Sequence, residues 1–356
     1  MLLSICLTTK AEGKSWMLKA LTAVKNYMDS SAIKGVDSCY IVAPQKPWQL
    51  LGHYYLSEMK QNMNSYFGPT EEFPRQDFYM DLQDRSRTLN ILGVWIGYRG
   101  YGIGYSVDIG GRSGTLFTTS LTGGSYGLNL RLRTFRSEHP KVTLKGVDED
   151  GEYIDLNGEL ELPRPIRVRT FYLDGYYLFN GKHFSYAAAY DQSVIQLRSS
   201  GSLMVGGMWQ YTTIRYNDDP NAFLVSMMHD VGVAKIGQGS LGIGYAYNWV
   251  PYRGFLVNAM VMPMLTLYNT QEMEFYDAHM LDDDTVDNDY LTYRSSETYR
   301  SKVTVSLNAR MSLTYNWKRL FMNVHGQWNR FRYNRGEESS GWINEWYVKT
   351  SIGVRF

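Results

Sequence analysis

The chain has 356 residues, with 29 Tyr, 9 Trp and 33 Gly against 10 Pro, and its mean hydropathy is −0.34. This composition favours many short strands over helices. The formal net charge of +1 gives no indication of the basic footprint of a nucleic-acid-binding protein. No run approaches the roughly 18 apolar residues of a transmembrane helix. A transmembrane barrel still fits, because its alternating strands keep the average hydropathy low.

The first residues resemble the back half of a secretory signal. A short apolar run is followed by a small residue, Ala11, before Glu12. We therefore predict that residues 1–11 are a signal remnant, and the alternative is a frayed soluble N-terminus. Removal of this segment would take away Cys6 and leave Cys39 alone, so we expect neither a disulfide framework nor a thiolate metal cage.

An amphipathic helix is predicted at residues 15–33. We place it in a periplasmic N-terminal segment, residues 12–46, ahead of a barrel that covers residues 47–356. Its apolar side chains recur at spacings of three and four. They are Trp16, Leu18, Leu21, Val24, Tyr27 and Met28.

From Trp48 onward the apolar period changes to two, which indicates strands. In the clearest case, Val303, Val305 and Leu307 begin one face, while Thr304 begins the other. Such segments run to about a dozen residues, past the five or six of an ordinary globular strand. A tilted strand of this length crosses a bilayer.

The alternation predicts an all-β fold, a closed antiparallel transmembrane β-barrel of about 14 strands. Dropping the two weakest segments, 114–121 and 222–233, gives 12 strands as the alternative. Fourteen is favoured because it keeps every long insertion on the external side, as in outer-membrane barrels. The predicted strands are 47–58, 87–98, 101–109, 114–121, 125–135, 166–179, 183–191, 202–215, 222–233, 239–249, 254–267, 302–315, 319–333 and 343–356.

Three long external loops are predicted, at about 59–86, 136–164 and 268–301. The last contains an acidic run from Asp282 to Asp289. Its carboxylates could gather a calcium ion, but the run lacks the Gly and the distal Glu of an EF-hand loop. We interpret it as a solvated surface, with calcium binding as the alternative.

Polar residues of both signs occupy the predicted inward face of the strands. A polar lumen needs both signs because an unpaired buried charge is costly. We interpret them as a network that plugs the interior. The alternative is a selective pore, since a barrel of about fourteen strands is wider than the eight-stranded type that side chains fill. The set is His53, Asp108, Asn129, Arg131, Arg133, Asp174, Gln210, Asn308, Arg310, Asn323, His325, Gln327, Asn329, Glu345, Lys349 and Arg355.

Catalytic and cofactor motifs are not found in the sequence. It has no G-x-S-x-G elbow, Walker loop or H-E-x-x-H, and the six histidines are not at metal-ligand spacing. The Gly-x-Gly pairs at 102–104 and 242–244 lie inside strands, where they indicate close packing against an inward side chain or sheet curvature. His325 would suit a lipid hydrolase only if it faced the bilayer, and its parity turns it inward. We expect no enzyme, metal or cofactor.

The terminal strand, Asn344 to Phe356, is the most regular. In a closed barrel it must pair with the first strand, near Trp48 to Leu56, so that no edge is left in lipid. Its outward residues resemble the signal by which the barrel-assembly machinery accepts outer-membrane proteins. They are Trp346, Val348, Ile352, Val354 and Phe356.

The sequence contains three short motifs besides its regular terminal strand. The motifs are Asp37-Ser38-Cys39-Tyr40-Ile41, Ser199-Ser200-Gly201-Ser202 and Gly244-Tyr245-Ala246-Tyr247-Asn248-Trp249-Val250. Together with the terminal strand, they resemble the Bacteroidota outer-membrane barrels catalogued as domain of unknown function 4421. The resemblance covers roughly residues 37–356, and it implies a barrel and an outer-membrane location. It supplies no catalytic residues and no agreed activity.

We therefore predict an integral protein of the Gram-negative outer membrane with a polar, charged lumen. It would act as a porin-like channel or transport protein, or as a component of envelope assembly. The expected partners are outer-membrane lipids, the barrel-assembly machinery and envelope proteins, and not nucleic acid. The competing classes are a lipid-modifying hydrolase of the outer membrane and a soluble β-sandwich binding module.

Overall fold

The computed structural model describes residues 2–31, 33–71, 74–85, 89–110, 114–137, 140–148, 150–280, 289–334 and 339–356. Its helices are α1 (Leu2–Ser31), α2 (Tyr186–Tyr190), η1 (Asp219–Asn221) and α3 (Ala222–Met227). Its strands are β1 (Ile41–Val42), β2 (Trp48–Phe67), β3 (Asp77–Arg85), β4 (Leu89–Tyr98), β5 (Tyr101–Asp108), β6 (Thr115–Thr122), β7 (Tyr126–Ser137), β8 (Lys141–Val147), β9 (Tyr153–Glu159), β10 (Ile166–Leu178), β11 (Ile195–Gln196), β12 (Ser200–Arg215), β13 (Val231–Trp249), β14 (Phe255–His279), β15 (Tyr290–Arg300), β16 (Thr304–Trp317), β17 (Leu320–Asn334) and β18 (Ser339–Arg355).

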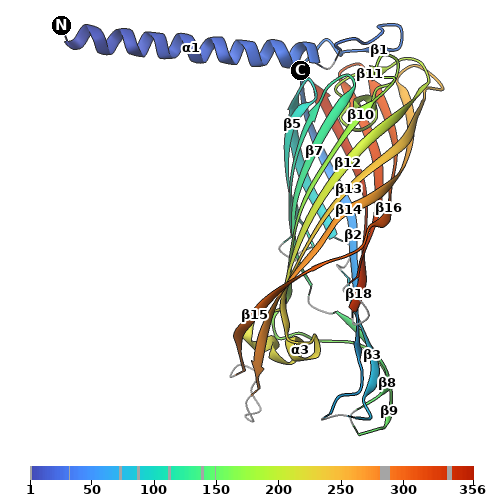
Figure 1. Ribbon diagram of the computed structural model, residues 1–356. Coiled ribbons are helices and arrows are strands. Elements are labelled where there is room, and N and C mark those ends of the chain that lie inside the picture. The colour runs from blue at the N-terminus through green and yellow to red at the C-terminus, as the bar shows by residue number, and fades with distance from the viewer. Residues whose placement is uncertain are drawn as a thin grey trace.

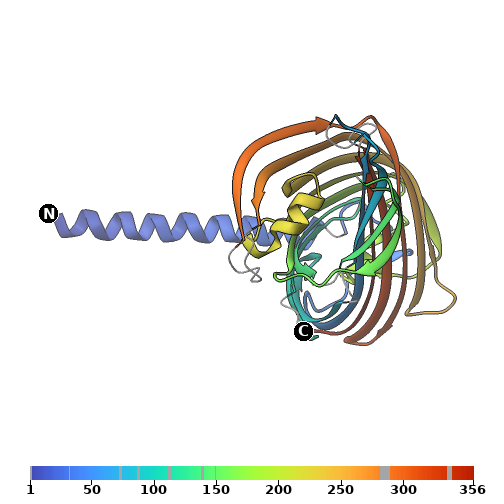
Figure 2. The ribbon, with the colours of Figure 1, turned by 90° about the horizontal axis from the view of Figure 1, so that it is seen from below.

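Twelve strands of the described chain close into an antiparallel barrel. Their order is β2, β4, β5, β6, β7, β10, β12, β13, β14, β16, β17 and β18, and β18 pairs with β2 to complete the ring. Figure 1 shows the barrel from the side, and Figure 2 shows the closed ring from one end. The predicted all-β barrel is confirmed, with the alternative count of twelve strands. The predicted pairing of the last strand with the first is confirmed as well, with Ile352 opposite Gly52.

The barrel has two unlike ends. The chain enters and leaves at the terminal end, where short turns at 99–100, 123–125, 250–254 and 318–319 join neighbouring strands. At the far end the predicted long loops carry strands of their own. One lobe adds β3, β8 and β9 to the extended β2, and the other adds β15 to the extended β14. Figure 1 shows these lobes and α3 well beyond the barrel wall.

Two segments predicted as strands are helical, which corrects the fourteen-strand count. Residues 183–191 contain α2, whose N-cap Ser185 accepts a hydrogen bond from the backbone N–H of Ala188. Three consecutive alanines follow the cap and favour a helix. Residues 222–233 contain α3, which follows Pro220 at the start of η1. The weakly patterned segment 114–121, by contrast, is a true barrel strand, β6.

Apolar and polar residues alternate along the barrel strands because one face of each strand is apolar and points outward. On β13, Leu241 and Ile243 are 60% and 66% exposed, whereas Ser240 and Ala246 on the other face are buried. The same outward apolar face recurs on β4, β5, β14 and β16. Within the described residues, no helix is both long and apolar enough to cross a membrane.

The predicted close packing at the Gly-x-Gly pairs is confirmed. A Cβ added to Gly102 would lie 2.0 Å from the ring of Trp95, and one added to Gly244 would lie 2.7 Å from Met262. Glycine lets these large side chains lie flat against the inner wall.

Replacement of Gly102 by Ala is therefore expected to destabilise the barrel by about 1–3 kcal/mol, the usual cost of overpacking. Gly52 is the matched control, because it lies on a barrel strand and a Cβ there would meet nothing within 4 Å. The temperature at which the folded, heat-modifiable band is lost on a gel measures both variants. Equal losses for Gly102→Ala and Gly52→Ala would show that the contact with Trp95 is not what requires glycine.

Candidate functional site in the barrel interior

Residues 180–199, which make up nearly all of the connection between β10 and β12, fold into the terminal end of the barrel; we call them the plug. The backbone carbonyl of Ala189 accepts hydrogen bonds from the side chains of Asn323 (2.9 Å) and Thr314 (3.3 Å). That of Gln192 accepts from Gln49 (2.5 Å) and Arg355 (2.8 Å). These four donors lie on β16, β17, β18 and β2, so inward side chains from a wide arc of the wall hold the plug.

More contacts fix the plug from other directions. Asn248 donates to the carbonyl of Ser185 (2.8 Å), and the Tyr190 hydroxyl donates to Asn258 (2.8 Å). Asp191 accepts a hydrogen bond from Thr122, and burial raises the pKa of Asp191 to about 6. The enclosure therefore disfavours the charged carboxylate, as expected where water is largely excluded.

The N-terminal segment closes over the plug. β1 pairs with β11 inside the plug, with Ile41 opposite Gln196. The backbone N–H of Asp37 donates to the carbonyl of Lys182 at 2.9 Å. The predicted periplasmic segment is thus continuous with the closure of the barrel at this end.

A charged layer fills the middle of the barrel. Arg310 donates to Asp174 at 3.0 Å, and Arg133 donates to Glu345 at 2.9 Å. The guanidinium of Arg131 lies 4.0 Å from the centre of the Tyr172 ring. Hydrogen-bonded ion pairs and cation–π contacts both offset the cost of burying charge. The layer is therefore only partly paired: Arg310 and Arg133 each have a carboxylate partner, whereas Nη2 of Arg131 and Nε of Arg133 have no hydrogen-bond partner among the described residues.

Both inward histidines lie within this network. Nε2 of His53 is 2.8 Å from Oγ of Ser106, and Nδ1 of His325 is 2.7 Å from Oδ1 of Asn323. Among the described residues, Nδ1 of His53 has no hydrogen-bond partner. The His53–Ser106 pair therefore lacks the third group that orients the base in a catalytic triad.

The structure places the other predicted lumen residues as follows. Asp174 also accepts from Asn129, and Gln327 donates to Tyr172 and accepts from Tyr347. Lys349 lies over the ring of Tyr55. Asp108 is separate from the rest, since it is partly exposed near the far end and accepts from the backbone N–H of Gly110. The remaining members, Gln210, Asn308 and Asn329, are buried.

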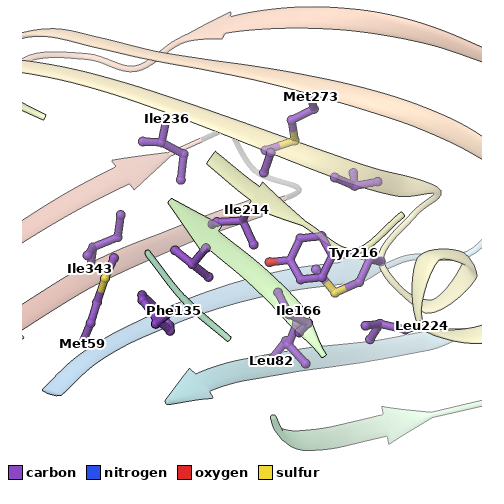
Figure 3. Close-up of a cluster of buried hydrophobic side chains, with 14 of the residues drawn as sticks. Met59, Leu82, Phe135, Ile166, Ile214, Tyr216, Leu224, Ile236, Met273 and Ile343 are labelled. Atoms are coloured by element: carbon purple, nitrogen blue, oxygen red, sulfur yellow. The ribbon is translucent and has the colours of Figure 1, made fainter. Parts of the chain in front are cut away.

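Toward the far end the interior becomes apolar, which the sequence reasoning missed. Figure 3 shows a cluster of buried side chains that includes Phe135, Ile166, Ile214 and Ile236. Phe135 follows Arg131 and Arg133 on the same inward face of β7, so the inner face changes character along a single strand. α3 supplies Leu224 to this cluster. The signal in the sequence is an inward face that turns from polar to apolar partway along some strands, such as β7.

Two cavities lie between the layers among the residues that the structure describes. One cavity of about 80 Å³ lies among Arg131, Asp174, Arg310 and Lys349, and another of about 20 Å³ lies beside Arg133. At the roughly 10–15 Å³ that one water molecule needs, the larger cavity has room for about five to eight waters and the smaller for about one. A larger groove of about 740 Å³ opens on the outer wall, lined by apolar residues such as Leu241, Ile243 and Val305.

The residues of the predicted assembly signal lie on the outward face of β18. Ile352 and Phe356 are exposed, and Trp346 donates to Glu58 at 2.8 Å. The backbones of Phe356 and Trp48 exchange hydrogen bonds of 3.1 and 3.2 Å, so the chain end is part of the ring.

The candidate calcium site cannot be placed, because residues 281–288 of the acidic run lie outside the described residues. Over the rest of the chain that the structure describes, no group of three or more His, Cys, Asp or Glu could hold a metal ion.

A family model described as Domain of unknown function (DUF4421) matches residues 36–356, so the chain belongs to that family. The Bacteroidota source implied by the resemblance stays a prediction. No curated protein matches the chain.

Among solved structures, the chain is similar to the outer membrane protease OmpT from Escherichia coli, with 13% identity over 88% of this chain and 98% of that one, and a TM-score of 0.38. It is also similar to the β domain of the Bordetella autotransporter BrkA, with 11% identity, coverage of 88% and 100%, and a TM-score of 0.32. For the translocator domain of the autotransporter NalP from Neisseria meningitidis the identity is 8%, the coverage 98% and 97%, and the TM-score 0.31. TM-scores this low carry no argument about activity.

Proposed function

We propose that the protein is an integral outer-membrane barrel that does not conduct, and that it serves as an anchor in envelope assembly. The observation that carries this proposal is the filled interior. The plug, the charged layer and the apolar cluster succeed one another along the barrel, and the two cavities found among the described residues of these layers measure about 80 and 20 Å³.

The exterior supports insertion in a bilayer. Apolar side chains cover the outward face of the barrel, and Val305 and Ile243 are among the most exposed. A closed ring leaves no unpaired strand edge in the hydrocarbon. Aromatic side chains gather at the terminal end, as in the interfacial girdles of outer-membrane barrels. Exposed members of this girdle are Trp48, Tyr126, Phe179, Trp249, Tyr252, Trp317 and Phe356.

The two competing roles, an open channel and a lipid hydrolase, fit the barrel interior less well. An open channel needs a continuous aqueous path, whereas the apolar cluster and the plug each close the interior. A lipid hydrolase needs its nucleophile at the bilayer, whereas the buried His53, Ser106 and His325 all lie inside the barrel. We therefore propose that the protein is not an enzyme.

Both ends of the barrel carry elements that other envelope proteins can bind. At the far end, β9 pairs only with β8, and β15 only with β14, within the described chain. Such strand edges carry unpaired backbone donors and acceptors that another chain can use. A barrel that is filled but carries lobes at one end and a helix at the other has the form of an anchor for other envelope proteins.

Thiol labelling of intact cells tests the location and orientation. Cys39 is a free, exposed thiol on the terminal side, and Thr298 is exposed on β15 at the far end. Two test proteins in a Cys6→Ser background carry a single thiol each. In the variant Cys39→Ser/Thr298→Cys the thiol is at position 298, and a membrane-impermeant maleimide should label it in intact cells. Cys39 itself should react only after the outer membrane is permeabilised. Labelling of both thiols, or of neither, in intact cells that carry the protein in the membrane fraction would refute the proposed placement.

A further inference from the structure

α1 carries an apolar stripe that the described chain does not cover. Leu21, Val24 and Met28 recur at spacings of three and four, so they share one side of the helix. Leu21 and Val24 are 63% and 55% exposed. Lys19 and Asn26 fall on the opposite side, and Lys25 lies at one edge of the stripe. A stripe of this kind on an extended helix needs an apolar surface to cover it.

The contacts at the end of α1 fix how the helix is rotated. The hydroxyls of Tyr27 and Tyr126 are 2.6 Å apart, and Ser31 accepts a hydrogen bond from Tyr101 at 2.8 Å. From the other flank, Asp29 accepts from Tyr98 at 2.6 Å. Tyr98, Tyr101 and Tyr126 belong to the outward faces of β4, β5 and β7. The helix end therefore rests on the aromatic girdle of the barrel.

The side of the helix that faces the barrel is the apolar one. Met28 is half-buried and Ser31 is buried, whereas Ser30, on the opposite side, is exposed. Leu21 and Val24 lie seven and four residues before Met28, so they face the same way as Met28. The apolar stripe thus continues the lipid-facing surface of the barrel wall.

The direction of the helix matches a membrane surface. In Figure 1, α1 leaves the terminal end sideways, across the long axis of the barrel, and Figure 2 shows it extending beyond the outline of the ring. Because the barrel axis crosses the membrane, a helix that runs across this axis at the girdle runs along the bilayer surface. Sixteen helical residues span about 24 Å, enough to leave the barrel wall and lie over lipid.

We propose that α1 is an interfacial membrane-binding helix. Its apolar stripe lies in the headgroup–acyl boundary of the leaflet at the terminal end, Lys19 faces water, and Lys25 lies at the edge of the stripe at headgroup level. Amphipathic helices of this composition bind phospholipid surfaces in this way. The inference rests on the proposed function, since it requires the barrel itself to span the bilayer.

Fluorescence quenching by brominated acyl chains tests this inference on the full chain in phospholipid vesicles. In a Cys6→Ser/Cys39→Ser background, an environment-sensitive dye is attached to Val24→Cys on the stripe or to Asn26→Cys on the opposite side. A third site, Ile243→Cys on the barrel exterior, reports insertion of the barrel. The Val24 dye is expected to be quenched about twofold more than the Asn26 dye and to a degree near that of Ile243.

The outcomes separate the two proposals. If Ile243 is quenched while Val24 and Asn26 behave alike, the barrel is inserted and the helix does not lie in the interface. If the Val24 dye is shielded from aqueous iodide but is not quenched by brominated lipid, protein covers the stripe and the inference is wrong. If Ile243 itself is not quenched, the proposed membrane insertion fails, and the interfacial role of α1 fails with it.

Discussion

Replacement of Asp174 by Asn is expected to destabilise the barrel by about 3–5 kcal/mol, because it leaves the Arg310 guanidinium buried without its counter-charge. Arg310 and Asp174 are each 8% exposed, and the donor and acceptor atoms are 3.0 Å apart. Arg310→Met should cost a similar amount, since it leaves the carboxylate unpaired. Equilibrium unfolding in urea, followed by tryptophan fluorescence of the vesicle-reconstituted protein, measures both variants.

The double variant Asp174→Asn/Arg310→Met should recover most of the loss, because neither charge is then left alone. The amide oxygen introduced by Asp174→Asn would still accept the hydrogen bond that Asn129 donates to Asp174 at 3.1 Å. The matched control is Asp155→Asn in the exposed pair Lys145–Asp155, whose side chains are 59% and 49% exposed. That change should cost at most about 1 kcal/mol. Strictly additive losses in the double variant would contradict a coupled ion pair in the lumen.

Removal of the plug is expected to open the terminal end as far as the charged layer. β10 and β12 are already paired at Leu178 and Met204, so a short Gly-Ser turn can replace residues 183–197 without disturbing the wall. The donors on Asn323 and Arg355 would lose their carbonyl acceptors and become hydrated. The ring of strands should survive, since its pairings do not pass through the plug.

Thiol reactivity measures this opening. Ser351 is buried on the inner face of β18 near the plug. In a Cys6→Ser/Cys39→Ser background, Ser351→Cys should be unreactive toward a small water-soluble thiol reagent with the plug present and as reactive as an exposed thiol without it. Equal reactivity in the two forms would show that the plug does not seal this end.

The barrel could be predicted because its signal is local and repeated. The alternation of apolar and polar residues along β13 or β16 indicates barrel strands with one apolar face. If the ring is closed, the terminal strand has to pair with the first. The plug helix α2 was predicted as a strand because its sequence is short and has no clear helical period. The sequence is Tyr186-Ala187-Ala188-Ala189-Tyr190. Its helical form depends on the Ser185 cap and on packing inside the barrel.

The interior could be predicted only in part, because its partners are distant in sequence. Strand parity placed Arg310 and Asp174 on inner faces, but nothing local indicates that residues 136 positions apart meet. The acceptors for Asn323 and Arg355 are backbone carbonyls of the plug, which carry no sequence signature. The apolar cluster was missed because inward faces were assumed to stay polar along their whole length, whereas β7 turns from Arg133 to Phe135.

Single-channel recording in planar lipid bilayers tests the central claim most directly. The purified wild-type barrel, shown to be folded by its heat-modifiable shift, is expected to insert and give no current steps across a range of voltages. Because the apolar cluster lies beyond the charged layer, the variant without residues 183–197 should also remain silent. Steady, reproducible current steps from the wild-type protein would contradict a filled, non-conducting barrel.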